Sequence, residues 1–170
     1  PGGNPHFFTD PRAGAAIAKG IAARLSELDP VHAADYQTNL ALFHQRLETS
    51  RQAWEKRLAP YRGAPVIGYH RTWTYLARWL GLSEVGFLEP KPGIPPNPSH
   101  IAQLLRVARE RKVRLVLQEE YYPDSTAKLI AQKVPAKLLR IPGGTNVSAG
   151  QSYLQHLEGI VSTLERDLGP

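Results

Sequence analysis

The stretch PVIGYHRTWTYLARWLGLSEVGFLE, residues 65–89, decides the fold. The short apolar run at 65–70 fits a buried strand, and the segment that follows fits a helix with Gly81 at its C-terminal end. Residues 84–89 fit a second strand. A strand, a short helix and another strand form the unit from which parallel sheets are built. The stretch therefore predicts an α/β protein with a parallel sheet.

The same alternation continues to the end of the chain. After a proline-rich loop come a helix starting at Asn97–Pro98, a strand at 113–119, a helix capped by Asp124 or Ser125, a strand at 136–141 and a closing helix at 153–168. Strands separated by helices of about 10–15 residues favour a parallel sheet with helices on both faces. The predicted fold class is thus α/β, a four-stranded parallel sheet flanked by helices.

The residues before 60 predict helices only. Asp10–Pro11 and Asp29–Pro30 each provide a capping side chain followed by a proline, the residue favoured at the first helical position. Apolar residues at helical spacing then mark one face of a helix over 31–58, which at a rise of about 1.5 Å per residue would reach roughly 40 Å. The α/β part is therefore expected to be preceded by a long helical strut.

Composition limits the classes of function. The chain has 170 residues, 42% hydrophobic and 21% charged, as expected for a globular protein. No run of about 18 apolar residues is present, so no membrane span is expected, and the first residues show no signal peptide. The net charge of +6 comes from basic residues that mostly stand beside acidic ones, which favours a solvated surface over nucleic-acid binding.

The chain contains no cysteine, which excludes disulfides, thiolate metal sites and cysteine nucleophiles. Any transition-metal site must then use histidine and carboxylate ligands, which suit zinc or manganese. The sequence also lacks a G-x-S-x-G elbow and an H-E-x-x-H motif. The loop PGGTN at 142–146 lacks the lysine of a P-loop and the spacing of a dinucleotide site, so it is a weak candidate for binding phosphate.

Polar side chains end the first three predicted strands. His70 ends the first, Glu89 the second, and Glu119 with Glu120 the third. Because ligands bind outside the carboxyl ends of parallel strands, we expect His70 and Glu119 to come within ligand distance of each other. Glu89, directly before Pro90, is expected to be structural or at the surface.

Histidine also stands near the start of the chain. His6 lies between a proline and two phenylalanines, and an imidazole buried there needs a hydrogen bond or a metal ion. The remaining histidines fall on predicted helices among polar neighbours and are expected at the surface: His32, His44, His100 and His156.

Four segments together resemble the solute-binding proteins of zinc and manganese ABC importers. They are NPHFFTDP (4–11), VIGYHRTWTYLARWLGL (66–82), NPSHIAQLLRVARERKVRLVLQEE (97–120) and GQSYLQHLEGIVSTL (150–164). Their order and spacing match the family over essentially the whole chain, and the first two segments are the most specific.

The resemblance implies one lobe of a two-lobe clamshell whose lobes are joined by a long helix. Residues 1–30 resemble a remnant of the N-terminal lobe, 31–60 the linking helix and 61–170 the C-terminal α/β lobe. Most of the N-terminal lobe, with its own histidine ligand, is then expected to be missing from this sequence.

The resemblance also implies a metal site between the lobes. His6 occupies the position of the histidine in the family's NPH segment, and His70 that of a ligand at the start of the C-terminal lobe, where histidine is typical of zinc-handling members. The acidic ligand that usually follows the last strand is absent from IPGGTN. Glu119 is the substitute candidate, with Glu120 behind it and a water as the alternative.

By resemblance, the protein is not an enzyme. It is expected to be a periplasmic or extracytoplasmic component, free or membrane-anchored, that captures zinc, or else manganese, and delivers it to an ABC permease, without a nucleic-acid partner. The residues leave three alternatives open. One is a metal-dependent hydrolase using His6, His70 and Glu119, another is a module that binds nucleic acid or anions, and the third is an interaction domain without metal.

Overall fold

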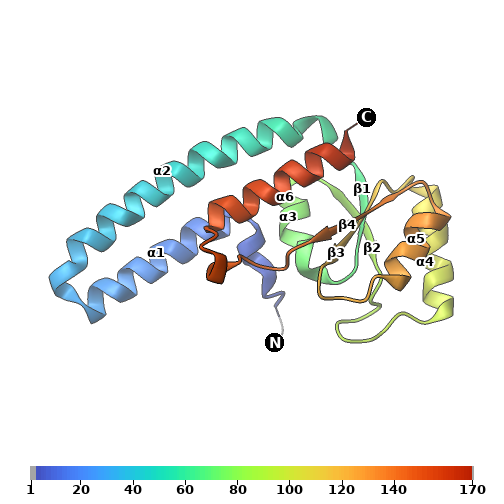
Figure 1. The fold of residues 1–170 in the computed structure, drawn as a ribbon, viewed down its shortest axis with the longest axis horizontal. Helices are drawn as coiled ribbons and strands as arrows, with labels where there is room; N and C mark the ends of the chain where they lie inside the picture. Colours follow the sequence, from blue (N-terminus) through green and yellow to red (C-terminus); the bar gives the residue numbers. More distant parts are fainter. Residues whose placement is uncertain (1–2, 170) are drawn as a thin grey trace.

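A computed structural model describes residues 3–169. The α-helices are α1 (Pro11–Leu28), α2 (Ala33–Leu58), α3 (Thr74–Leu80), α4 (Pro98–Glu110), α5 (Ser125–Lys133) and α6 (Tyr153–Leu168). The strands are β1 (Pro65–Gly68), β2 (Ser83–Phe87), β3 (Leu115–Glu119) and β4 (Lys137–Ile141) (Figure 1). Short 3₁₀ helices are η1 (His6–Thr9), η2 (Pro30–His32), η3 (Ala59–Tyr61), η4 (Arg71–Trp73) and η5 (Val147–Ala149).

The sheet confirms the predicted fold class. Its four strands lie in the order β2-β1-β3-β4, and every neighbouring pair is parallel. The carboxyl end of β1 is therefore flanked by the carboxyl ends of β2 and β3. The residues that follow these three strands meet at one edge of the sheet, which is the reason His70, Glu89 and Glu119 are neighbours.

Helices cover both faces of the sheet (Figure 1). On one face, α2, α3 and α6 bury a core that includes Trp54, Trp73 and Leu117. On the other, α4 and α5 bury a second core that includes Ile67 and Ile130. Alternate residues of the strands point into the two cores, as expected for a sheet buried on both sides.

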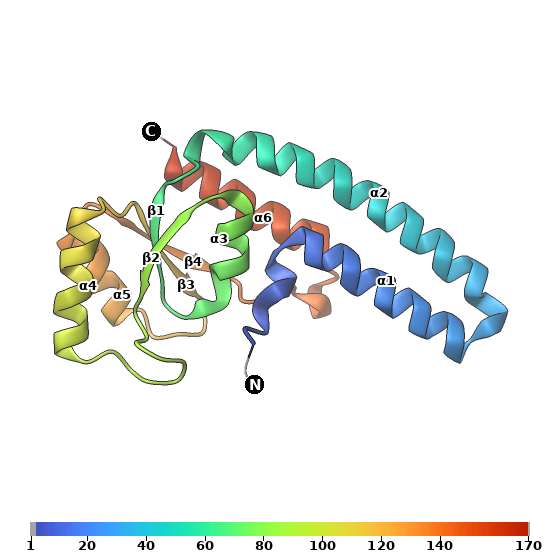
Figure 2. The ribbon, with the colours of Figure 1, turned by 180° about the vertical axis from the view of Figure 1, so that it is seen from behind.

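Helices α1 and α2 form an antiparallel hairpin that projects beyond the α/β body (Figures 1 and 2). Asp10 caps α1 by accepting a hydrogen bond from the Arg12 backbone, as predicted. Helix α2 is the predicted strut, and all of its buried residues (Leu47, Trp54 and Leu58) belong to its second half. The first half lies along α1 and reaches the body at Phe43, which packs against the core beside Tyr153 of α6.

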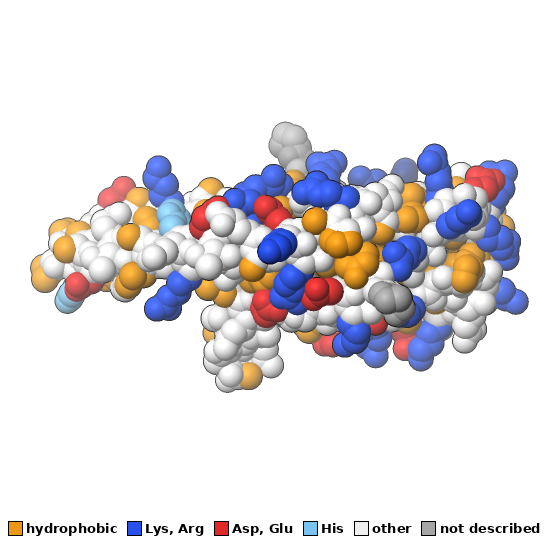
Figure 3. Space-filling view, turned by 90° about the horizontal axis from the view of Figure 1, so that it is seen from above, with side chains coloured by type: hydrophobic (Ala, Val, Ile, Leu, Met, Phe, Trp, Pro, Cys, Tyr) orange, Lys and Arg blue, Asp and Glu red, His pale blue; other side chains and the backbone are white. Residues whose placement is uncertain are grey.

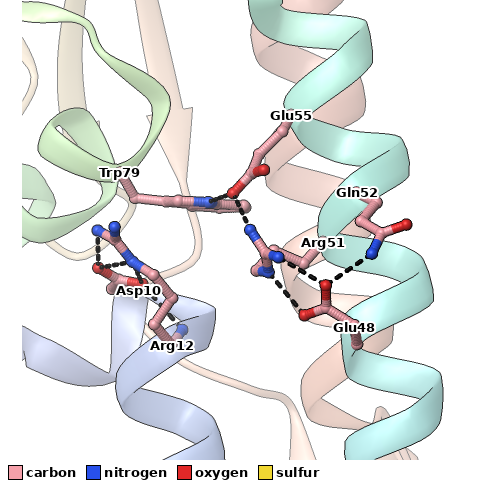
Figure 4. Close-up of polar contacts among 7 residues, drawn as sticks. All are labelled: Asp10, Arg12, Glu48, Arg51, Gln52, Glu55 and Trp79. Carbon is pink, nitrogen blue, oxygen red and sulfur yellow. Dashed lines mark hydrogen bonds and ion pairs between the residues drawn. The ribbon is translucent and has the colours of Figure 1, made fainter.

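Polar contacts fasten the second half of α2 to α3 (Figure 4). The Glu55 carboxylate accepts hydrogen bonds from the Trp79 indole of α3, at 2.7 Å, and from Arg51, at 2.6 Å. Arg51 also pairs with Glu48, one turn earlier on α2. The indole holds Glu55 from outside the helix, so this network resists rotation of α2 against the body.

A second set of contacts joins α2 to α6. The Trp54 indole donates to Glu158 at 2.6 Å, and Arg57 pairs with both Glu158 and Glu165.

Figure 3 shows Lys and Arg interspersed with Asp and Glu on the face it presents. Within residues 3–169 no helix is both long enough and apolar enough to cross a membrane.

Candidate metal site

The structure brings His6 and His70 together. Their ring centroids lie 5.3 Å apart and the rings meet edge to face, with 78° between their planes. His6 begins η1, and His70 follows β1 by two residues. Because η1 packs against α3 and η4, His6 is held at the carboxyl edge of the sheet.

Asn4 fixes the ring of His6. Its side-chain amide donates to the Arg71 carbonyl at 2.7 Å, so its Oδ1 atom is the acceptor that faces His6. That oxygen accepts from the His6 backbone at 3.0 Å and lies 2.8 Å from the ring Nδ1. The Nδ1 atom must therefore carry the proton, which leaves the Nε2 lone pair free to bind a metal.

Glu89 fixes the ring of His70. Its Oε2 atom lies 2.6 Å from His70 Nδ1, and the two side chains are only 9% and 17% exposed. The carboxylate accepts a hydrogen bond from Nδ1–H, so here too the Nε2 lone pair is free. The expectation that Glu89 serves only structure or surface missed this contact. The only sequence signal was its place at the end of a predicted strand; the structure shows that this strand lies beside β1.

Imidazoles whose Nε2 atoms are free are suitable ligands for zinc, and they also suit manganese or other divalent transition metals. Partial burial lowers the pKa of His6, and repulsion from His70 lowers it further. The lowered pKa favours the neutral form of His6, the form in which imidazole binds a metal. The pair lacks carboxylates in ligand geometry: residues 3–169 hold no group of three or more His, Cys, Asp or Glu side chains that could share a metal ion.

Glu119 lies close to this pair but does not join it. It is fully buried at the end of β3, and neither of its carboxylate oxygens has a hydrogen-bond partner among the described residues. Burial raises the pKa of Glu119, while the nearby Thr72 hydroxyl and His70 partly oppose that rise. Glu119 was expected within ligand distance of His70, but within residues 3–169 it does not form a three-ligand cluster with the two histidines. Glu120, the second candidate, is exposed.

Aromatic side chains wall the site. The Tyr69 and Tyr122 rings stack at 4.3 Å, Tyr122 lies 6.4 Å from the His70 ring, and Phe8 lies 6.3 Å from the ring of His6. Apolar rings around a metal site limit the access of solvent to it. The sequence analysis did not identify this wall.

The loop after β4 contributes no carboxylate. Residues 142–152 include neither Asp nor Glu, so the acidic ligand absent from IPGGTN has no substitute within the loop itself.

The other histidines serve the fold. His32 lies 2.8 Å from the Asp29 carboxylate, and His44 and His100 bond the carbonyls of Ala15 and Phe87. The expectation that His156 is at the surface is wrong: it is 4% exposed, because its side of α6 faces the sheet.

Comparisons with known proteins identify the family of this chain. The family model described as "Zinc-uptake complex component A periplasmic" (ZnuA) matches residues 2–167. The high-affinity zinc uptake system protein ZnuA of Brucella abortus is 25% identical over 162 residues, which are 94% of this chain and 48% of that protein. The chain thus spans about half the length of this relative.

Solved structures show the same fold. A mutant of the laminin-binding adhesin Lmb from Streptococcus agalactiae superposes with a TM-score of 0.87 at 25% identity, over 99% of this chain and 66% of that one. The solute-binding protein FpvC of Pseudomonas aeruginosa, solved with Mn²⁺, superposes with a TM-score of 0.83 at 27% identity, over 97% of this chain and 63% of that one.

Proposed function

This chain belongs to the ZnuA family of periplasmic zinc-uptake components, and we propose from that membership that it captures a divalent transition metal, zinc first and manganese next, for an ABC importer. The observation that carries the proposal is the pair of imidazoles, His6 and His70, each held with Nδ1 bonded and Nε2 free. The metal is cargo, so the site needs to bind and release it rather than activate it.

The proposed ligands are His6, His70 and Glu119. The two imidazoles supply nitrogen ligands, which zinc binds at about 2.0–2.1 Å. Glu119 supports the set because it is buried, unpaired and close enough to His70 to influence its charge. Swinging that carboxylate onto the metal would give its oxygens the partner they lack. Water, or groups outside this chain, would fill the remaining position.

Delivery and location extend the same proposal. We propose an extracytoplasmic protein that hands its metal to a membrane permease, with no role for nucleic acid. The description of the family as periplasmic supports the compartment. Residues 1–30, 31–60 and 61–170 are proposed as an N-terminal-lobe remnant, the linking helix and the C-terminal lobe.

The hydrolase alternative has less support. A hydrolytic metal site needs an open position together with a base that activates water. Here the carboxylate nearest to the imidazoles, Glu89, is already committed to the Nδ1 atom of His70. The relatives named above are described by zinc uptake, metal binding or adhesion.

Zinc titration by calorimetry tests the proposal. The chain itself, His6→Ala, His70→Ala and the control His32→Ala are titrated with zinc at pH 7.5. We expect one zinc per chain, a loss of more than about 100-fold in affinity for each of the first two variants, and no change for the control, whose histidine bonds Asp29 far from the site. Equal affinity of His70→Ala and the unchanged chain would overturn the proposal.

A further inference from the structure

We infer that Glu89 is a positioning residue of the metal site. Its carboxylate holds the ring of His70 with Nε2 toward the ion, and it also fastens the turn at residues 91–94 to the same site. The effect of Glu89 on metal affinity rests on the proposed function. Its effects on the His70 ring and on the turn are properties of the metal-free protein and rest on geometry alone.

The backbone sets Glu89 beside His70. Beyond the named strands the ladder continues: Leu88 donates to the Gly68 carbonyl at 2.8 Å, and Glu89 donates to the Tyr69 carbonyl at 3.0 Å. The residue that carries the carboxylate is therefore bonded to the residue just before His70. The side chains complete the contact at 2.6 Å, where both are largely buried. This alignment leaves little freedom for another pairing.

A carboxylate in this place determines which nitrogen can bind a metal. An imidazole that donates a hydrogen bond from Nδ1–H to a carboxylate keeps the Nε2 lone pair, and the negative charge makes that nitrogen a more basic metal ligand. Glu119 cannot take this part, because neither of its oxygens bonds any described residue. Glu89 is thus the carboxylate that the fold commits to His70.

The same oxygen reaches a turn. Glu89 Oε2 also accepts a long hydrogen bond, 3.4 Å, from the Gly93 backbone. Lys91 and Ile94 close the turn through a 2.9 Å backbone bond, with Pro92 and Gly93 between them and Gly93 at φ +76°. Proline followed by glycine with positive φ is the signature of a type II turn. An exposed rigid turn and a metal ligand therefore share one carboxylate.

The inference is tested on the full chain with Glu89→Ala and Glu89→Gln, and with Glu120→Ala as the control at the neighbouring strand end. Nitrogen-15 spectra of the imidazoles in the metal-free protein at pH 8 report the proton's position. We expect the Nδ1–H form of His70 in the unchanged chain and the control, and a shift toward the Nε2–H form in Glu89→Ala. The Gly93 amide signal is expected to move in the same variant.

Glu89→Gln keeps the shape of the side chain and a neutral acceptor. We expect it to retain the Nδ1–H form while zinc binds more weakly than in the unchanged chain, and Glu89→Ala to lose about 10–100-fold in zinc affinity. Retention of the Nδ1–H form in Glu89→Ala, or in Glu89→Gln zinc affinity equal to that of the unchanged chain, would overturn the inference. If the unchanged chain binds no zinc, the proposed function fails, whereas the imidazole spectra still decide the role of Glu89.

Discussion

Three side chains at the carboxyl edge of the sheet differ in what they bond. Among residues 3–169, the rings of His6 and His70 each have one nitrogen bonded and one free, whereas Glu119 is buried with both oxygens unbonded. A buried polar group without a partner costs about 1–3 kcal/mol. Proteins retain such destabilising groups mainly at functional sites. Glu119 is thus the residue at which a functional role most clearly lowers stability.

Replacing Glu119 with glutamine is expected to stabilise the metal-free protein at neutral pH. Burial raises the folded-state pKa of Glu119 above its value in the unfolded chain. The unfolding free energy contributed by such a group is highest below the unfolded pKa and falls as pH rises through the folded pKa, because the folded state must then hold a buried charge. Glutamine cannot ionise and avoids that loss.

Denaturant titrations from pH 4 to pH 8 measure this effect. We expect Glu119→Gln to exceed the unchanged chain by about 1–3 kcal/mol at pH 8, and the gap to close toward pH 4. His6 and His156, whose pKa values are lowered by burial, titrate in both proteins and cancel in the difference. A gap that grows as pH falls would contradict the assignment.

His6 and His70 could be singled out from the sequence, whereas the contact of Glu89 with His70 and the placement of Glu119 could not. His6 and His70 stand in segments whose order and residues match a known family, so they could be located before the structure. Glu89 was missed because its role depends on strand order: β2 lies beside β1, and a list of strand ends does not reveal which ends are neighbours. The separation of Glu119 from the imidazole pair depends on side-chain directions, which the sequence does not specify.

Among the elements, α1 determines whether His6 reaches the site. Gly14 of α1 lies against Tyr153 of α6, where an added Cβ would stand 2.6 Å from the phenol oxygen. That phenol donates to the Phe8 carbonyl at 2.7 Å, two residues after His6. The contact therefore ties the closing helix to the segment that carries the first proposed ligand.

Alanine at two glycines of α1 is expected to have opposite effects. Gly20 has open space around it, so Gly20→Ala should raise the unfolding free energy by about 0.5–1 kcal/mol through helix propensity. Gly14→Ala should lower it, because the Tyr153 ring must move from the Phe8 carbonyl. Thermal unfolding of both variants measures this, and equal stabilisation by both would show that the α1–α6 contact does not constrain the fold.

Most elements could be predicted because local signals agreed with the fold. Asp10 and Asn97 cap helices as expected, and Gly81 ends α3 with φ +72°. Strand boundaries were less certain: the predicted strand at 113–119 begins at Leu115, since Lys112 turns with φ +52° and Val113 is buried outside the ladder. Tertiary hydrogen bonding, rather than hydrophobicity, decides where pairing starts.

For the molecule as a whole, burial is uneven. The α/β body buries two cores, whereas the far end of the α1–α2 hairpin is exposed, with Leu28 at 65% and Val31 at 87%. An apolar groove of about 500 Å³ runs between α1 and α2 and includes Ile21 and Phe43. The hairpin end is thus held by far fewer buried contacts than the body.

Hydrogen exchange should follow this difference. We expect the slowest amides in β1 and β3, at the centre of the sheet, and fast exchange at the hairpin end, residues 21–42, because local opening there costs little buried area. Mass spectrometry of peptides from both regions measures the rates. Uniform protection along the hairpin would mean that it is as stable as the body.

The central claim is that His6 and His70 bind one divalent ion through their Nε2 atoms. Anomalous diffraction at the zinc edge, from crystals of the zinc-loaded chain, tests it most directly. We predict a single strong peak about 2.0–2.1 Å from both Nε2 atoms. A peak elsewhere, for example at His32 or His44 with the two rings unoccupied, would contradict it.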